Sequence, residues 1–399
     1  MERHNYDDST NIIKDTVRPD PVSGAVNPPL QLSSTFAQKD PEFLGKYDYA
    51  RSGNPTRDVV EESIAHLERG SRGFAFSTGM AAISAAFLSL HQGDHVIVTK
   101  DVYGGTFRLI TELLPNYGIS HTFVDMNDQD ALEAAFQENT KVVYIETPSN
   151  PTLKVTDIKA VASLAHAHGA LVFADNTFMT PLFQKPLELG ADLVVHSATK
   201  FLSGHSDILA GLIVTKDKKL GETIYFIQNA MGATLGVNDC WLLLRGLKTL
   251  KVRLQAEAKS ALKLAQWLEK QPGVKSVKYP GLTSDASYKV QKSQASSGGA
   301  VLSFDVGNEQ NVRTLVQHLQ IPIFSVSLGA VETILSYPCT MSHAELDQTE
   351  QTDCGVTPGL LRLSVGIEDL SDLEKDFQNA LAYLPEAKSV KPDLKVKYS

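Results

Sequence analysis

A lysine preceded by two hydroxyl residues follows a short apolar run near the middle of the chain. Residues 193–195 predict a buried strand, and Ser197, Thr199 and Lys200 come where that strand would end. Ligands bind at this end of the strands in open parallel sheets. A lysine that is desolvated there has a lowered pKa, so its amine can act as a nucleophile and form an imine. The alternative is an ordinary surface lysine after a strand.

Asp175 ends the most apolar of the predicted strands, 171–174. A carboxylate at such a position is costly unless it faces a cation or several hydrogen-bond donors. The protonated ring nitrogen of pyridoxal phosphate is a suitable cation, and an aspartate partner keeps that nitrogen protonated. Lys200 lies 25 residues later, one strand on, so both side chains are expected at one sheet edge. The alternative role for Asp175 is the N-cap of the next helix.

A candidate phosphate site lies at Gly79, which follows a predicted strand and opens a helix of small residues. Free backbone N–H groups and the helix dipole favour an anion there, and glycine lets the anion come close. A tight turn with glycine present for packing is the alternative. No two glycines stand two residues apart, and Gly45-Lys46 lacks the upstream glycine of a P-loop. The pattern therefore favours a phosphate-bearing cofactor other than NAD or ATP.

Three further residues extend the candidate site. Arg362 is a charge inside a predicted apolar strand, so it needs an anionic partner, either a ligand carboxylate held bidentately or a structural salt bridge. Tyr103 and Asn150 follow other predicted strands at the same edge, where Tyr103 either stacks on a cofactor ring or forms the cleft wall. His166 and His168 point to different faces of a predicted helix, so we expect no metal site.

Short apolar runs that alternate with helical stretches position these residues. This alternation is typical of βαβ units and predicts an α/β fold with a mainly parallel sheet. A helix with Thr56 as its N-cap is expected first. The expected strands are then 73–76, 95–98, 120–124, 142–145, 171–174, 193–195 and 212–214, and the expected helices are 79–90, 104–117, 128–137, 157–168, 181–188 and 222–247.

The pattern changes to α+β after Pro272, which indicates a second, smaller domain. We expect a cofactor-binding domain over 49–247 and a C-terminal domain over 248–399, joined by a long helix near 248–270. The first part of the chain, 1–48, is rich in proline and is either disordered or an arm that packs on something else. Strands are expected at 274–279, 299–306, 321–325 and 360–364, with helices at 308–319 and 370–383.

Composition restricts the class of protein. The 399 residues carry a net charge of −9, so no basic surplus exists to bind nucleic acid or an anionic membrane. No apolar run is long enough for a transmembrane helix, and the first residues show no signal peptide. Three scattered cysteines suit a reducing cytoplasm, where we expect the protein to act.

Taken together, these residues resemble the Cys/Met-metabolism family of pyridoxal-phosphate enzymes, from Tyr49 to Asp369 and above all over 192–207. The resemblance implies an aspartate-aminotransferase-like (fold type I) architecture with pyridoxal 5'-phosphate as cofactor. Lys200 would carry the cofactor as an imine, and Asp175 would bind its ring nitrogen. The other implied roles are ring stacking and catalysis by Tyr103, phosphate binding by Gly79, Met80, Ser197 and Thr199, and substrate-carboxylate binding by Arg362 and Ser327, with Asn150 nearby.

The same resemblance implies a shared active site. Tyr49 and Arg51 match residues that reach the phosphate of a neighbouring subunit, so the arm would pack across a dimer interface. Two such dimers would form a homotetramer, with a small amino-acid substrate as the other partner.

The reaction is expected to be β-elimination. Residues 325–338 look most like cystathionine β-lyases of Gram-positive bacteria. Animal-type γ-lyases and many γ-synthases carry a glutamate where this chain has Val326, and methionine γ-lyases usually carry a cysteine in place of Gly105. The expected products from L-cystathionine are homocysteine, pyruvate and ammonia. A γ-lyase or γ-synthase in the same family and a non-enzymatic α/β ligand-binding protein are the alternatives.

Overall fold

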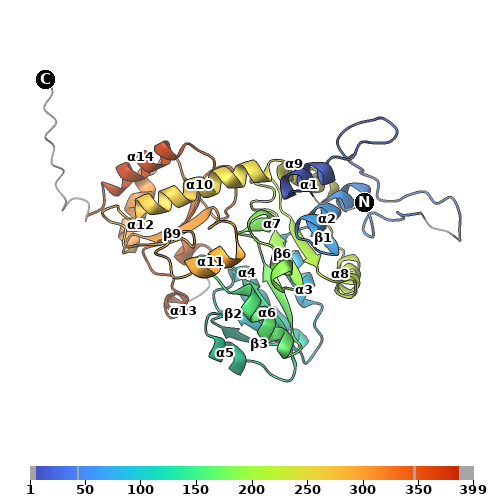
Figure 1. Cartoon of the computed structure of the whole chain (residues 1–399), viewed down its shortest axis with the longest axis horizontal. Helices are drawn as coiled ribbons and strands as arrows, with labels where there is room; N and C mark the ends of the chain where they lie inside the picture. The colour runs from blue at the N-terminus through green and yellow to red at the C-terminus, as the bar shows by residue number, and fades with distance from the viewer. Residues whose placement is uncertain (1–5, 43–44, 345–346, 386–399) are drawn as a thin grey trace.

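A seven-stranded sheet forms the centre of the larger domain (Figure 1) in the computed structural model, which describes residues 6–42, 45–344 and 347–385. The strand order is β1-β7-β6-β5-β4-β2-β3, and only β7 runs antiparallel to its neighbours. Each predicted strand lies within an observed one, so the mainly parallel sheet is confirmed. The strands are β1 Arg72–Phe76, β2 His95–Thr99, β3 Ser120–Val124, β4 Thr140–Glu146, β5 Leu171–Asp175, β6 Leu193–Ser197 and β7 Gly211–Thr215.

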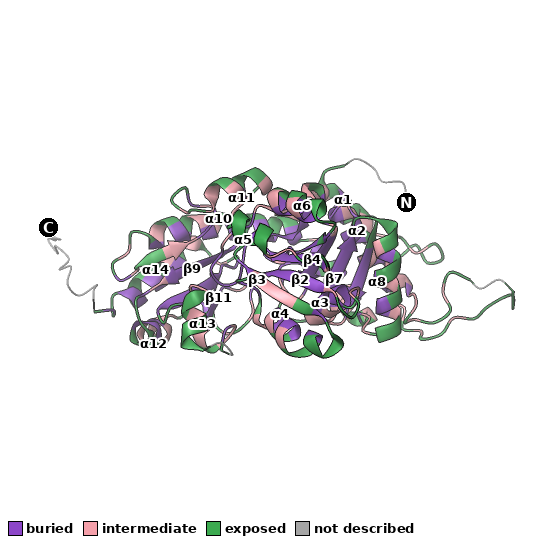
Figure 2. Ribbon diagram, turned by 90° about the horizontal axis from the view of Figure 1, so that it is seen from below, coloured by how far each residue is buried: buried purple, intermediate pink, exposed green. Residues whose placement is uncertain are grey.

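Helices cover both faces of this sheet, which explains why its inner strands are largely apolar and buried, whereas the edge strand β3 is only partly buried. In β6, Val194 packs into one hydrophobic cluster, whereas Leu193 and Val195 pack into the cluster on the other face. Figure 2 shows the strands as a buried layer between helices whose outer sides are exposed. These helices are α2 Pro55–Leu67, α3 Gly79–Phe87, α4 Gly104–Arg108, η1 Leu109–Leu113, η2 Leu114–Tyr117, α5 Gln129–Ala134, α6 Ile158–Ala167, α7 Thr180–Phe183, η3 Pro186–Leu189, α8 Lys218–Met231 and α9 Val237–Leu247.

The C-terminal domain is built on a five-stranded sheet with the order β10-β11-β12-β9-β8. Only β10 and β11 pair in parallel. The sequence prediction missed β11, α11 and α13, which are short. The elements are β8 Ser276–Lys278, α11 Tyr288–Gln294, β9 Val301–Asp305, α12 Glu309–His318, β10 Ile323–Phe324, β11 Ile334–Ser336, η4 Pro338–Thr340, α13 Gln348–Asp353, β12 Leu360–Ser364 and α14 Leu370–Leu381.

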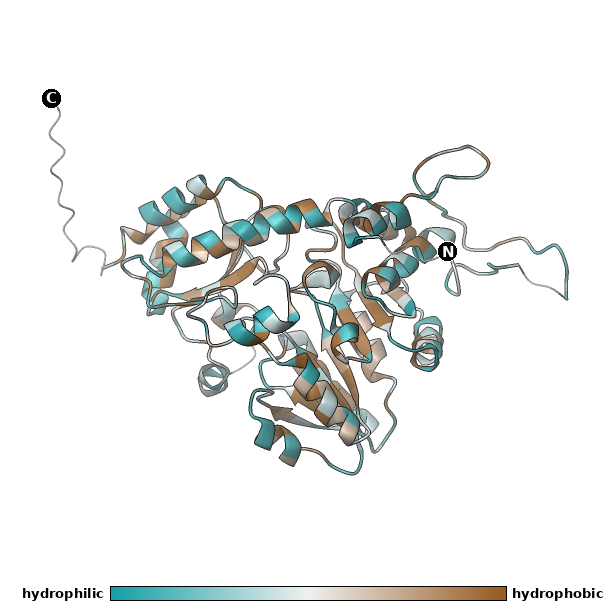
Figure 3. Ribbon diagram, viewed as in Figure 1, coloured by the Kyte–Doolittle hydropathy of each residue, from teal (hydrophilic) through white to brown (hydrophobic). Residues whose placement is uncertain are grey.

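One long helix, α10 (Leu250–Leu268), belongs to both domains. Leu250 and Leu254 pack into a cluster of the larger domain, whereas Leu264 and Leu268 pack into the C-terminal one. Figure 3 shows this helix with hydrophilic and hydrophobic stripes along its length. The helix therefore fixes the two sheets relative to each other.

Three local predictions were wrong. The stretch 222–247 is two helices, because Gly232 takes the left-handed backbone (φ 74°) that ends α8. The stretch 181–188 is divided between α7 and η3, because Gln184 is extended. The N-cap of α2 is Asn54 rather than Thr56: its side chain accepts from the backbone N–H of Thr56, and proline occupies the first helical position.

The first part of the chain contains a helix that was not predicted. Residues Asp8–Thr16 form a helix, α1, whose Ile12 is buried in the same hydrophobic cluster as Val60 of α2. This segment therefore packs on its own chain. The segment after α1 runs over the surface, where Val22 and Leu32 are 93% and 69% exposed. Among the described residues, no helix combines the length and the apolar character that crossing a membrane requires.

Candidate active site

Lys200 lies just beyond the end of β6, in a turn closed by its N–H donating to the carbonyl of Ser197 (3.2 Å). Its Nζ donates to the hydroxyl of Ser327 at 2.6 Å. Burial and, to a lesser extent, the positive charge of Arg362 together lower the pKa of Lys200 to about 8. A lysine of this kind holds a usable fraction of neutral amine near physiological pH.

Asp175 is the last residue of β5 and lies opposite Val195 of β6. It is buried, with 8% of its surface exposed, and burial raises the pKa of its carboxyl group. The backbone N–H of Thr177 donates to its Oδ1 at 2.9 Å. The Asp175 side chain therefore neither forms an ion pair nor caps a long helix. A buried carboxylate at this edge can hold the protonated ring nitrogen of a cofactor.

The candidate phosphate site lies where α3 begins, beside β6. Thr78 caps α3 by accepting from the N–H of Ala81 at 2.9 Å, which leaves the first amides of the helix facing outward. A Cβ at Gly79 would lie 3.0 Å from the hydroxyl oxygen of Ser197. Glycine therefore lets the helix start approach the end of β6 without a shift of Ser197. The N–H of Ala210 donates to the hydroxyl of Thr199 at 3.0 Å, which anchors the turn on β7's side.

Arg362 is buried in the middle of β12, where 4% of it is exposed. Its guanidinium donates to Asn150 Oδ1 (2.7 Å), the carbonyl of Ser327 (2.6 Å) and Ser336 Oγ (2.9 Å). All of these acceptors are neutral, its Nε has no partner in the described chain, and burial lowers the pKa of Arg362 to about 10. Such a guanidinium suits a bidentate carboxylate ligand and argues against the structural salt bridge.

Ser327 links the lysine to the arginine. Its hydroxyl accepts from Lys200 and its carbonyl accepts from Arg362. Its φ of 83° lies in the left-handed region, which is unfavourable for a residue with a side chain. Strained backbone of this kind persists where surrounding contacts fix it, and it is frequent at functional sites.

Tyr103 lies at the start of α4, with 41% of it exposed. A Cβ on Gly105 would lie 2.6 Å from Tyr103 Cε1 and 2.8 Å from Met80 Sδ, so the ring, the sulfur and this glycine are neighbours. The backbone N–H of Tyr103 donates to Glu146 Oε2 at 2.9 Å. Sequence reasoning missed Glu146, although it ends a strand directly beside Asp175's strand.

The structure does not bring every predicted residue to this place. Arg51 donates to both the carbonyl and the Oδ1 of Asn229 on α8, each at 2.7 Å, and lies over the exposed ring of Tyr49. Neither residue contacts the Lys200 site in the described parts of this chain. Also among the described residues, no group of three or more histidine, cysteine, aspartate or glutamate side chains is arranged to hold a metal.

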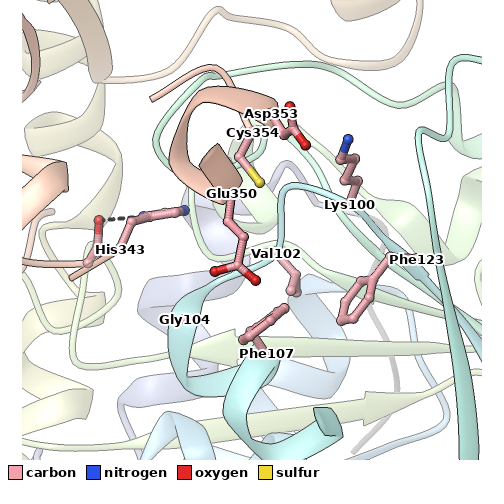
Figure 4. Close-up of a pocket in the computed structure, with 10 residues that line it drawn as sticks. Lys100, Val102, Gly104, Phe107, Phe123, His343, Glu350, Asp353 and Cys354 are labelled. Atoms are coloured by element: carbon pink, nitrogen blue, oxygen red, sulfur yellow. Dashed lines mark hydrogen bonds between the residues drawn. The ribbon is translucent and has the colours of Figure 1, made fainter. Parts of the chain in front are cut away.

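A cavity of about 160 Å³ lies beside the start of α4, between the two domains (Figure 4). Its floor is formed by the rings of Phe107 and Phe123 and by Val102, and α13 covers it with Glu350 and Cys354. The cavity is lined by Lys100, Val102, Gly104, Phe107, Phe123, Ser342, His343, Glu350, Asp353 and Cys354.

These residues fit pyridoxal phosphate. A lysine with a lowered pKa, a buried carboxylate on the neighbouring strand and a helix start at which glycine gives close access all lie at the carboxyl edge of one sheet. They match the imine, ring-nitrogen and phosphate functions of that cofactor.

Comparisons with known proteins agree with this fit. The sequence profile of the Cys/Met metabolism PLP-dependent enzymes matches residues 9–382. Cystathionine beta-lyase MetC of Bacillus subtilis (strain 168) is 57% identical over 381 residues, which cover 96% of this chain and 98% of that protein. Cystathionine gamma-lyase of the same organism is 45% identical over 372 residues, which cover 93% and 98% of the two chains.

Solved structures show the same architecture. Cystathionine gamma-lyase from Lactobacillus plantarum, complexed with L-serine, superposes with a TM-score of 0.91 at 44% identity and covers 94% of this chain and 99% of its own. Cystathionine gamma synthase from Xanthomonas oryzae pv. oryzae, in complex with aminoacrylate and cysteine, gives a TM-score of 0.93 at 38% identity and covers 97% and 100%. The predicted fold type I architecture and the pyridoxal phosphate cofactor are thus confirmed, and the chain belongs to the Cys/Met metabolism PLP-dependent enzyme family.

Proposed function

We propose that this chain is a carbon–sulfur lyase that converts L-cystathionine to homocysteine, pyruvate and ammonia by β-elimination. The observation that carries the proposal is the link through Ser327, which holds the amine of Lys200 and the guanidinium of Arg362 beside each other. A base and a carboxylate-binding group at this spacing suit proton removal from the Cα of an amino acid. The β-lyase of Bacillus subtilis, at 57% identity, supports the choice of substrate.

In this proposal the chain binds the cofactor through two groups of residues. Asp175 holds the ring nitrogen, and Tyr103 stacks on the ring. Phosphate binding falls to Gly79, Met80, Ser197 and Thr199, with Tyr49 and Arg51 supplied by a neighbouring subunit. Pyridoxal phosphate would be held by Lys200 until the substrate amine takes the place of the lysine, and it would then supply the electron sink that makes the Cα–H bond acidic.

The remaining residues act on the substrate. Arg362 binds the α-carboxylate bidentately, and Asn150 and Ser327 fix the orientation of its guanidinium. Lys200 then takes the proton from Cα. Lys200, which then carries the Cα proton, or the hydroxyl of Tyr103 protonates the homocysteine thiolate as it leaves Cβ. Elimination thus releases homocysteine first, and the three-carbon aminoacrylate that leaves afterwards is hydrolysed by water to pyruvate and ammonia.

A cystathionine γ-lyase is the second candidate, because a relative with that name is 45% identical over nearly the full length. Two residues favour β-elimination. Position 326 is an exposed valine in place of glutamate, and Gly105 leaves no space for the cysteine found in methionine γ-lyases unless Tyr103 moves.

We also propose that the enzyme is a cytoplasmic homo-oligomer, a dimer with shared active sites that pairs into a tetramer. Support comes from the exposed segment after α1, from the position of Tyr49 and Arg51 away from their own Lys200, and from three cysteines that form no disulfide.

The test is to supply L-cystathionine to the purified holoenzyme and identify the oxo acid released. Pyruvate together with homocysteine supports the proposal, whereas 2-oxobutyrate together with cysteine would replace it by the γ-lyase. Lys200→Ala is the control, since loss of the base should lower turnover by at least about 100-fold while the fold, followed by circular dichroism, is kept.

A further inference from the structure

Two buried carboxyl groups end neighbouring strands at the cofactor site. Glu146 closes β4 and Asp175 closes β5, and the two residues are directly paired in the register of this parallel pair. Their exposed fractions are 6% and 8%. Side chains at paired positions of adjacent strands point to the same face of a sheet, so both carboxyl groups lie on one side.

Two carboxylates in such a place cannot both be ionised at little cost, because their repulsion is poorly screened away from water. Burial, and then the charge of Asp175, raise the pKa of Glu146 well above its usual range. Burial also raises the pKa of Asp175, but the hydroxyl and the N–H of Thr177 oppose that rise. The hydroxyl of Tyr144 adds a third donor, at 3.5 Å from Asp175 Oδ2.

The donors around Glu146 come from the backbone instead. The N–H of Tyr103 donates to its Oε2 at 2.9 Å, and the N–H of Asn150 donates to the same carboxyl group. Glu146 therefore ties down the two loops that carry the proposed ring-stacking tyrosine and the amide partner of Arg362. A carbonyl oxygen accepts these N–H bonds whether or not the carboxyl group is ionised.

We propose that Glu146 is a positioning residue that works as a neutral carboxylic acid, so that Asp175 remains the single negative charge at the strand ends. The inference rests on the proposed role of Asp175 as the partner of the cofactor ring nitrogen. One negative charge then matches one ring cation. An ionised Glu146 would in addition attract Arg362 and compete with the substrate carboxylate for it, since the two groups are within electrostatic reach.

Infrared spectroscopy of the holoenzyme tests this directly, because the C=O stretch of a protonated carboxylic acid is separate from carboxylate bands. We expect such a band in the wild type and its loss in Glu146→Gln. In Asp175→Asn the band should persist but be lost at a lower pH than in the wild type, because burial still raises the pKa of Glu146 while the charge of Asp175 no longer does. Glu257→Gln is the matched control: Glu257 is another buried carboxyl group, on α10, whose pKa burial raises to about 8, so its own band is removed without affecting that of Glu146.

The bound cofactor gives a second measurement. Glu146→Gln replaces one neutral group by another, so the midpoint of the pH-dependent absorption change of the cofactor should stay at the wild-type value. If Glu146 carried a charge, its removal would lower this midpoint by about one pH unit or more. A lowered midpoint, or no carboxylic-acid band that depends on Glu146, would overturn the inference. Neither result depends on which thioether is cleaved, so the proposed β-lyase activity is tested separately by the oxo acid.

Discussion

At the scale of single residues, the site brings together groups that are costly to bury. The amine of Lys200 and the guanidinium of Arg362 both lose water, and the charge of Arg362 disfavours the charge of Lys200. Neither is paired with a carboxylate within the described chain. Arg362 can therefore bind an anionic ligand, and Lys200 can react with a carbonyl group. Burying the two groups lowers the stability of the protein.

The first prediction follows for the apoenzyme. Lys200→Met should raise the free energy of unfolding at pH 7 by up to about 3 kcal/mol, because it removes a buried ammonium whose pKa is lowered from 10.5 to about 8. In the wild type, stability should rise between pH 8 and 10.5, where the unfolded chain still holds the proton that the folded chain has released. The variant should lack this rise. Urea titrations of the wild type and the variant at pH 7, 8 and 10.5 measure the free energy of unfolding. A variant less stable than the wild type at pH 7 would refute the prediction.

The second prediction concerns the carboxylate clamp. Arg362→Lys keeps the positive charge but loses the bidentate geometry, so KM for L-cystathionine should rise by about 10- to 100-fold. Steady-state kinetics on the holoenzyme measure this. Arg313→Lys, an exposed arginine on α12, serves as control and should leave KM unchanged. An unchanged KM in Arg362→Lys would place the clamp elsewhere.

At the scale of elements, the sequence predicted those strands and site residues that a local pattern of residues specifies. Most strands of the larger sheet were found because they are apolar runs buried on two faces, although the edge strand β3 is only partly buried. Lys200, Asp175 and Gly79 follow such runs. The left-handed backbone of Ser327 has no local signal. The bond from Arg362 to Asn150 joins residues 212 positions apart, and only the folded sheets bring them together. Glu146 was not predicted as a site residue, because its role depends on the pairing of β4 with β5.

The third prediction concerns the packing of α3 on β7. A Cβ at Gly211, the first residue of β7, would lie 2.1 Å from the carbonyl oxygen of Thr78. Gly211→Ala should therefore push the start of α3 outward, weaken cofactor binding by about tenfold or more and cost about 1–3 kcal/mol of stability. Absorbance titration of the apoenzyme with pyridoxal phosphate measures the affinity. Gly236→Ala is the control, since its Cβ would meet nothing closer than 3.9 Å; equal affinities in the two variants would contradict the prediction.

At the scale of the whole molecule, the proposed site is incomplete within one chain. Arg51 and Tyr49 lie by α8, and the exposed segment between α1 and α2 has apolar side chains that no element of its own chain covers. Both features agree with an arm that completes the site of a second copy.

The fourth prediction is complementation between two inactive variants. In a hybrid dimer of Lys200→Ala and Arg51→Ala chains, one site carries both changes and the other carries none. Refolding an equal mixture should therefore restore about a quarter of wild-type activity, although each variant alone is strongly impaired. If mixing restores no activity while hybrids are detected by native mass spectrometry, Arg51 acts within its own chain.

The helix α10 has a consequence for protein engineering. Its first half completes the hydrophobic core of one domain and its second half that of the other, so its sequence must be compatible with both at once. In a chimera with a relative, α10 should therefore come from the same parent as the two hydrophobic clusters that it packs against, one in each domain. Swapping the C-terminal domain alone, to move substrate preference from one lyase to another, would leave half of this helix facing a foreign core.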